Sequence, residues 1–150
     1  MSTDLAIPSM SPQAIERVIR LEDHLLATQE QLPILTEHSL HAGLYARTLR
    51  LFPDAVITGA LIKIPTLLIT SGHCYVWLDG LVQENHGHVL MRAAAVRKTA
   101  FRAITDTSLT MCFATAAKTV EEAEAEFTDE ASCLMSRHPG AINIVNGECR

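Results

Sequence analysis

Turn-forming residues punctuate the middle of this chain at short, regular intervals. Five such places divide residues 45–115: Pro53-Asp54, Ser71-Gly72, Asp79-Gly80, Asn85-His86-Gly87 and Thr105-Asp106-Thr107. Glycine, proline, asparagine and aspartate favour turns, and the stretches between them have the length and composition of strands rather than helices. Short strands at this spacing are typical of double-sheet jelly rolls. The sequence therefore predicts a mainly β, jelly-roll barrel over residues 45–115.

Alternation within these stretches indicates which side chains face the interior. Successive side chains of a strand point to opposite faces. In the stretch from 45 to 51, one face carries Tyr45, Arg47 and Leu49, and the other carries Ala46, Thr48 and Arg50. Near the end of the barrel, Leu109, Met111 and Phe113 share a face.

A helix is expected on each side of the barrel. Ser11-Pro12 is typical of a helix start, and apolar residues then recur at helical spacing as far as about residue 31. Thr119 and Glu122 form a capping box that opens a second amphipathic helix, ending before Pro139-Gly140. We therefore expect helices over 12–31 and 119–136.

The chain divides by composition into three parts. They are an N-terminal helical segment (1–35), the barrel (36–115), and a C-terminal helix with a tail (116–150). The tail beyond residue 138 is either disordered or an edge strand added to a neighbour. The apolar stripe of the first helix needs a cover, either a second subunit or the outside of the barrel. We favour a subunit contact and so expect a homo-oligomer.

Charge is distributed unevenly along the chain, whose net charge is −5. Residues 1–39 carry two basic and six acidic side chains, residues 40–115 seven and four, and residues 116–150 three and seven. The acidic flanks either dock on the cationic barrel or face solvent; alternatively, some barrel cations line a pocket for an anionic ligand. Long nucleic acid is not an expected partner, because acidic flanks repel a phosphate backbone.

Composition indicates a folded protein of the cytoplasm. Apolar residues make up 48% of the chain, too many for a disordered protein. We find no apolar run near the roughly 20 residues that span a bilayer and no signal peptide at the start, so a membrane partner is not expected. The four cysteines have no CxxC spacing, and buried free thiols are expected at Cys74 and Cys112.

An ordered set of motifs over residues 36–115 resembles a known group of proteins. The set comprises Thr36-Glu37-His38, the stretch from Gly43 to Pro53, Gly59 through Ser71-Gly72, Arg97-Lys98 and Asp106-Thr107. It is similar to small cupin-like proteins of bacteriophages and prophages. The resemblance implies the barrel fold and a phage or prophage setting. It also implies metal-binding histidines and a glutamate before the Ser71-Gly72 pair, and a histidine on the last strand.

This chain departs from that pattern at the metal ligands. Ile62, Pro65 and Thr66 stand before the Ser71-Gly72 pair, and Phe113 stands on the last strand. Apolar and hydroxyl side chains hold divalent cations poorly. We therefore expect no metal in the barrel centre and no cofactor. The His86-Gly87-His88 pair could start a metal site in a strand, but a polar turn is the favoured interpretation.

Cationic residues on several strands suggest an anion clamp. Arg97-Lys98 lies where many cupins place a turn and a metal-binding histidine, and Arg47, Arg50 and Lys63 stand on other strands. Guanidinium groups grip carboxylates and phosphates bidentately. If 97 and 98 lie in a regular strand, only one of the two side chains can point inward. The predicted ligand-binding residues are Tyr45, Arg47, Lys63, Arg97, Lys98 and His38.

Three functions follow as hypotheses. The first is a non-catalytic phage or prophage accessory protein that binds a small anionic molecule, such as a nucleotide signal of host defence. The second is a metal-free epimerase or isomerase acting on a sugar nucleotide, with His38 or His41 of the 37–41 segment as a base near Tyr45. The third is a structural virion or assembly protein. Tyr45 and Trp77 would stack on a ring-shaped ligand or belong to the core.

Overall fold

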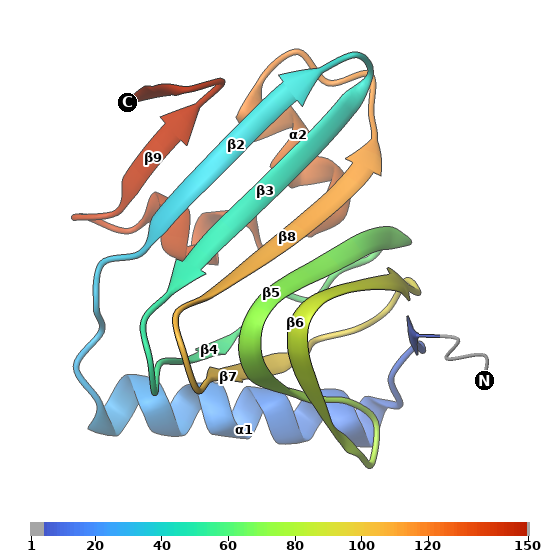
Figure 1. Ribbon diagram of the computed structural model, residues 1–150, viewed down its shortest axis with the longest axis vertical. Helices are drawn as coiled ribbons and strands as arrows, with labels where there is room; N and C mark the ends of the chain where they lie inside the picture. Colours follow the sequence, from blue (N-terminus) through green and yellow to red (C-terminus); the bar gives the residue numbers. More distant parts are fainter. Residues whose placement is uncertain (1–4, 150) are drawn as a thin grey trace.

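A long hairpin organises the fold in the computed structural model, which describes residues 5–149 (Figure 1). Its strands are β5 (Thr66–Trp77) and β6 (Val82–Ala93), paired antiparallel along their whole length. β5 also pairs with β8 (Thr107–Ala114) through residues 67–71 and with β7 (Ala100–Ala103) through residues 74–77. The sheet therefore divides at β5 into two arms, and the predicted mainly β fold class is confirmed.

The remaining strands extend the two arms. One arm continues from β8 through β3 (Leu44–Leu51), β2 (Leu35–His41), β9 (Ile142–Val145) and β10 (Glu148–Cys149). The other continues from β7 to β4 (Val56–Thr58), and β1 (Ala6–Ile7) lies beside β6. Among the described strand pairs, β1–β6 and β2–β9 are parallel and the others are antiparallel.

Two of the predicted turns are wrong, and Gly72 explains one of them. Ser71-Gly72 lies inside β5, and Asn85-His86-Gly87 lies inside β6. Gly72 has φ +127°, and a Cβ there would stand 2.5 Å from the Asp106 carbonyl oxygen. Glycine permits both the conformation and the close approach. Gly72 therefore marks the place where β5 passes from one arm to the other, rather than a chain reversal. The chain between β4 (Val56–Thr58) and β5 is irregular rather than a strand.

The helices begin as predicted and end early. α1 (Pro12–Thr28) starts at Ser11, whose hydroxyl accepts a hydrogen bond from the Ala14 amide. α2 (Val120–Phe127) starts at Thr119, which accepts from the Glu122 amide. Beyond α2, the chain forms two short 3₁₀ turns, η1 (Ala131–Cys133) and η2 (Met135–Arg137). α2 ends at Thr128, whose backbone is extended, and the Phe127 carbonyl accepts a hydrogen bond from the Lys63 amide.

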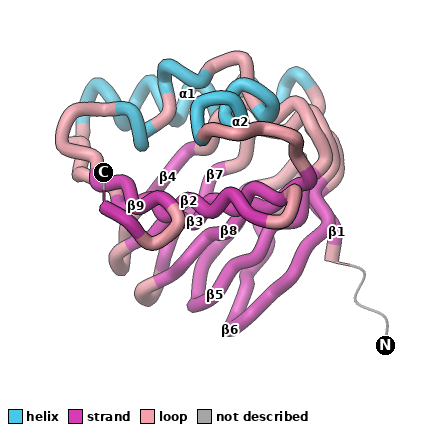
Figure 2. The backbone as a smooth tube through the Cα atoms, turned by 90° about the horizontal axis from the view of Figure 1, so that it is seen from above, coloured by secondary structure: helices cyan, strands magenta, loops and turns pink. Residues whose placement is uncertain are grey.

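Both helices lie on the same side of the strands (Figure 2). Ala14 and Val18 of α1 are buried with Met10 and Ala100, so the first helix covers part of its own sheet. Of the two covers considered for its stripe, the outside of the barrel is the one that the structure contains. The homo-oligomer remains a prediction. Within residues 5–149, no helix has the length and apolar content needed to cross a membrane.

The core lies between the sheet and α2. Tyr45, Leu109, Met111 and Phe113 are buried together, as the strand alternation predicts. The tail expectation is wrong, because β9 pairs with β2 of the same chain instead of adding to a neighbour. All four cysteines are free; Cys74 is buried, Cys112 is half-buried, and the other two are exposed.

Candidate functional site: an interior cavity with one unneutralised arginine

A cavity of about 780 Å³ lies between α1, the inner faces of β3 and β8, and the segment after α2. Its walls are mostly apolar and include Leu49, Leu68, Met111 and Phe127. Its lining reaches the surface at Leu26, Leu32 and Phe52, which are exposed. Arg47, Arg97 and Lys98 also line the cavity. The structure therefore brings together three of the six predicted ligand-binding residues.

Arg47 is neutralised by α2. Alternation along β3 turns Arg47 inward beside Tyr45, where only 6% of it is exposed. Its Nη1 donates to Glu124 Oε2 at 2.9 Å, and its Nη2 donates to Ser136 Oγ at 2.9 Å. Arg137 donates to the other oxygen of Glu124. The buried carboxylate thus joins the sheet to the C-terminal segment and compensates the charge of Arg47.

Lys98 is neutralised by α1. Its Nζ donates to Glu22 Oε2 at 3.1 Å and to the Gly59 carbonyl at 2.9 Å. Glu130, from the segment after α2, lies 3.9 Å away. Lys98 is 2% exposed, so it is the buried half of an ion pair whose carboxylates come from both flanks of the chain.

Arg97 differs from both neighbours. It is also 2% exposed, yet no carboxylate of residues 5–149 lies within 4.0 Å of it. Its Nη1 donates to the Ala94 carbonyl at 2.7 Å, and its Nη2 donates to Thr66 Oγ1 at 2.7 Å. Burial lowers the pKa of Arg97 to about 10, so the group still carries its charge at neutral pH.

Two weak contacts leave Arg97 capacity to bind. Its Nη1 lies 3.3 Å from the Ile64 carbonyl, and its Nη2 lies 3.8 Å from Met111 Sδ. Sulfur is a weak acceptor, and Met111 lines the cavity. The two short bonds therefore fix the guanidinium, while the two long contacts can give way to a stronger acceptor that enters the cavity.

An irregular backbone places Arg97 and Lys98 on the inside together. Val96 has φ +63°, a conformation that β-branched residues rarely adopt. Arg97 forms only an isolated bridge to Ile62, and 98 and 99 belong to no strand. The alternation that would send one of the two side chains outward therefore does not apply here.

The other predicted residues lie elsewhere. Lys63 is partly exposed and pairs with Asp129 at 2.6 Å. Tyr45 is fully buried between Phe113 and Phe127. His38 Nδ1 lies 2.7 Å from Tyr45 Oη, and its Nε2 lies 2.7 Å from Asn143 Oδ1. Burial lowers the pKa of His38 and raises that of Tyr45. Trp77 packs with the small cluster beneath α1.

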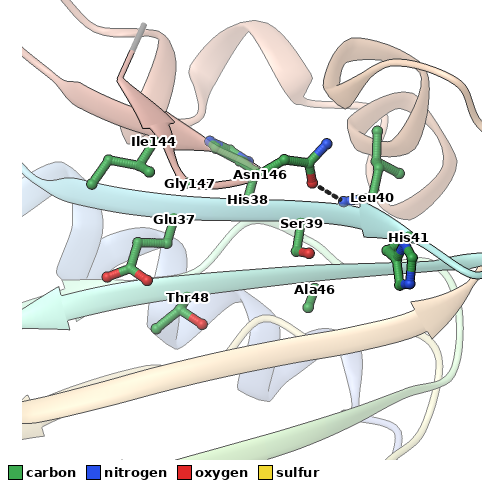
Figure 3. A pocket seen from close by; sticks show the side chains of 10 residues that line it. All are labelled: Glu37, His38, Ser39, Leu40, His41, Ala46, Thr48, Ile144, Asn146 and Gly147. Carbon is green, nitrogen blue, oxygen red and sulfur yellow. Dashed lines mark hydrogen bonds between the residues drawn. The ribbon is translucent and has the colours of Figure 1, made fainter.

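The 37–41 segment lines a separate depression on the outer face (Figure 3). Glu37, Ser39 and His41 alternate with His38 along β2, and His38 is buried on the other side. Glu37 pairs with Arg50 at 3.0 Å. Asn146 accepts a hydrogen bond from the Leu40 amide across this depression. The segment therefore does not assemble a base beside the interior cavity.

Glu22 and Glu124 are the residues that sequence reasoning did not single out. Glu124 stands four residues after Val120 and three before Phe127, so helical spacing puts it on the buried face of α2. Glu22 occupies the edge of the apolar stripe of α1 in the same way. A carboxylate on an apolar stripe is the signal that would have identified both residues as partners for buried cations.

Comparisons with known proteins find distant structural matches. No family model matches the chain, and no curated protein matches its sequence. A solved cupin superfamily protein from Desulfitobacterium hafniense matches with TM-score 0.48 and 10% identity, covering 77% of this chain and 98% of that one. KdgF from Halomonas sp. matches with TM-score 0.46 and 15% identity, covering 55% and 79%. A variant of salicylate 1,2-dioxygenase from Pseudoaminobacter salicylatoxidans matches with TM-score 0.48 and 15% identity, covering 77% and 35%. At these identities and TM-scores, neither a family nor an activity passes from those proteins to this chain.

Proposed function

We propose that this protein binds a small organic anion in the interior cavity and does not turn it over. The acid group of the ligand contacts Arg97, and its apolar body lies against the cavity walls. One observation carries the proposal: Arg97 is buried at the wall of a large cavity, and no carboxylate of the described chain compensates its charge.

The energetics of burial favour an anion at Arg97. An ion that leaves water without a partner costs several kcal/mol, and a charge-assisted hydrogen bond recovers part of that cost. Arg47 and Lys98 meet this requirement within the chain, through Glu124 and Glu22. Arg97 has only neutral acceptors. A bound carboxylate or phosphate would supply the missing charge.

The charges in the cavity limit the ligand to a single negative charge. Arg47 and Lys98 already hold carboxylates, and further anionic groups would lie near Glu22 and Glu130. A cavity of this size, mostly apolar with few polar groups, suits a drug-sized ligand. The favoured class is therefore a monocarboxylate or phosphate monoanion with an aromatic or aliphatic body.

The limit of one negative charge also restricts which nucleotide a phage accessory protein of this kind would bind. The idea of a phage or prophage accessory protein that sequesters a nucleotide signal rests on the sequence resemblance. A cyclic mononucleotide has a single negative charge and satisfies the charge limit, whereas nucleoside di- and triphosphates do not. A purely structural virion role gives no reason to bury an arginine without a counter-charge.

The epimerase hypothesis has one observation in its favour and one against it. His38 and Tyr45 are hydrogen-bonded at 2.7 Å, as an acid–base pair would be. However, Tyr45 is 0% exposed and lies behind Phe127, so a substrate in the cavity does not reach it. Binding without turnover is therefore the better-supported function.

Titration calorimetry with a panel of anions tests the proposal. The panel contains aromatic and medium-chain monocarboxylates, cyclic mononucleotides, sugar phosphates and nucleoside triphosphates. We expect a singly charged member with an apolar body to bind wild type. Arg97→Met, which keeps an unbranched apolar stem and removes the guanidinium, should weaken that binding about tenfold to a hundredfold.

Lys63→Met is the matched control, because it removes a cation that the structure places at the surface. Its affinity should stay within about twofold of wild type, in line with the small contribution of exposed charges. The proposal is wrong if no member of the panel binds wild type, or if Arg97→Met binds as tightly as Lys63→Met.

A further inference from the structure

The outer face of the β5–β6 hairpin carries two histidines and a glutamate in adjacent positions. His73 of β5 lies directly opposite His86 of β6, and Tyr75 lies opposite Glu84. Cys74 and Asn85, their neighbours in sequence, are buried on the inner face. Alternation therefore turns His73, Glu84 and His86 outward together, away from the interior cavity.

The donor atoms of these three residues converge. Glu84 Oε1 lies 3.0 Å from His73 Nε2 and 2.5 Å from His86 Nε2. The two imidazole rings are stacked, with centroids 3.9 Å apart, and both Nε2 atoms contact the same oxygen of Glu84. In the part of the chain that is described, this is the group of histidine, cysteine and carboxylate side chains whose ligand atoms all lie within 4.8 Å of one another.

We propose that His73, Glu84 and His86 form a surface binding site for a zinc-like divalent cation. Two imidazole nitrogens and one carboxylate oxygen are ligands that Zn²⁺ accepts. Ligand bonds of about 2.0–2.1 Å at tetrahedral angles separate the donor atoms by about 3.3 Å. The two separations from Glu84 Oε1 require only a small opening, and the His86 side chain is 65% exposed.

The charge of the group also suits a cation. The Glu84 carboxylate brings one negative charge to the group and accepts a hydrogen bond from each imidazole. Metal binding replaces these two hydrogen bonds with two coordination bonds from Nε2, so the proton of each neutral imidazole leaves Nε2 and is taken up at Nδ1 through exchange with water. Three protein ligands leave one tetrahedral position for water or an external ligand.

The site differs from the histidine pair that stands out in the sequence. His86 and His88 are two residues apart, but His88 Nδ1 lies 3.2 Å from Ser71 Oγ and takes no part in the group. The second imidazole comes instead from β5, across the hairpin. The site also shares no residue with the cavity around Arg97, so it is independent of the proposed anion binding.

Calorimetry with Zn²⁺ alone, on tag-free protein, tests this site. Exposed Cys133 and Cys149 also attract Zn²⁺, so all proteins carry Cys133→Ser and Cys149→Ser. This background should bind about one Zn²⁺ per chain. His86→Ala and Glu84→Gln should each lower the affinity at least tenfold, because each removes one of three ligands. His88→Ala, on the same strand as His86, and His41→Ala, at the end of β2, are controls and should bind as the background does.

A second readout concerns stability. Zn²⁺ that binds only the folded state raises the unfolding temperature of the background protein, and this rise should disappear in Glu84→Gln. The proposal is wrong if the background protein binds no Zn²⁺. It is also wrong if His88→Ala weakens binding as much as His86→Ala, since the ligands would then be those of the sequence pair.

Discussion

The cavity wall holds two buried arginines in different electrostatic environments. Under α2, Arg47 is 6% exposed and shares Glu124 with Arg137. In the segment between β6 and β7, Arg97 is 2% exposed and meets only carbonyls, a hydroxyl and a sulfur. Burial alone therefore does not separate a structural cation from a binding one. The counter-charge distinguishes the two arginines: Arg47 joins two parts of the fold through Glu124, whereas Arg97 is the residue for which we propose an anionic ligand.

The largest expected effect is the loss of the Arg47 ion pair. Arg47→Met leaves Glu124 buried with one fewer cation, and breaking a buried pair costs about 3–5 kcal/mol. Chemical denaturation should show the free energy of unfolding reduced by about this amount. A loss below about 1 kcal/mol would mean that Arg137 alone compensates Glu124, and the contrast between Arg47 and Arg97 would weaken.

Lys98→Met should have an intermediate effect. The lysine is buried, but the side chain of its partner Glu22 is 33% exposed, so water can solvate the carboxylate when the ammonium is removed. We expect a loss of about 2 kcal/mol in the free energy of unfolding. Glu22→Gln removes the other half of the same ion pair. It should leave the Lys98 ammonium buried with Glu130, 3.9 Å away, as its carboxylate neighbour.

Arg97→Met should change the stability of the ligand-free protein by less than about 1 kcal/mol, in either direction. The variant loses two short hydrogen bonds and also loses an unpaired buried charge, and these effects oppose each other. Because the folded-state pKa of about 10 lies below the ordinary value of 12.5, the folded protein binds this proton less tightly than the unfolded chain. The charged Arg97 side chain therefore destabilises the folded wild-type protein fully at neutral pH, and this destabilisation decreases as the pH rises above about 10.

A loss of about 3 kcal/mol or more in Arg97→Met would contradict this contrast. Arg97 would then support the fold as Arg47 does. Denaturation of both variants under identical conditions, without added anions, makes the comparison direct.

The smallest expected effect concerns His38, which does not line the interior cavity. Its pKa lies below the ordinary value of 6.5 because of burial, so the folded state disfavours the protonated ring. The associated stabilisation is fully present above pH 6.5 and is lost as the pH falls toward the lower folded-state pKa. His38→Gln should remove this part of the pH dependence. Unfolding curves of both proteins between neutral and mildly acidic pH should diverge most at neutral pH; a constant difference would mean that His38 is not a buried neutral group.

Local patterns predicted the parts of the fold that depend on neighbours in sequence. Alternation placed Tyr45, Arg47 and Leu49 on one face, and capping residues located both helix starts. The charge distribution suggested, as one alternative, that the acidic flanks dock on a basic barrel. Glu22 and Glu124 make such contacts, with Lys98 and Arg47.

Features that depend on distant contacts were not predictable in the same way. Ser71-Gly72 has the composition of a turn, but pairing with β8 and β7 on either side of Gly72 keeps β5 continuous. The sequence also placed Arg97 and Lys98 side by side with no sign that only Lys98 has a carboxylate partner. The cluster of His73, Glu84 and His86 likewise depends on the β5–β6 register, because His73 lies thirteen residues before His86 in the sequence.

The central claim is that an anion contacts Arg97 and not Arg47. Nuclear magnetic resonance of the arginine side-chain N–H groups, in protein labelled with nitrogen-15, tests it directly during titration with the monoanion selected by calorimetry. Arg97→Met and Arg47→Lys assign the two guanidinium signals. We expect the Arg97 signals to shift and to sharpen, because a charge-assisted contact restricts rotation of the guanidinium, while the Arg47 signals stay in place. Shifts at Arg47 with unchanged Arg97 signals would contradict the account.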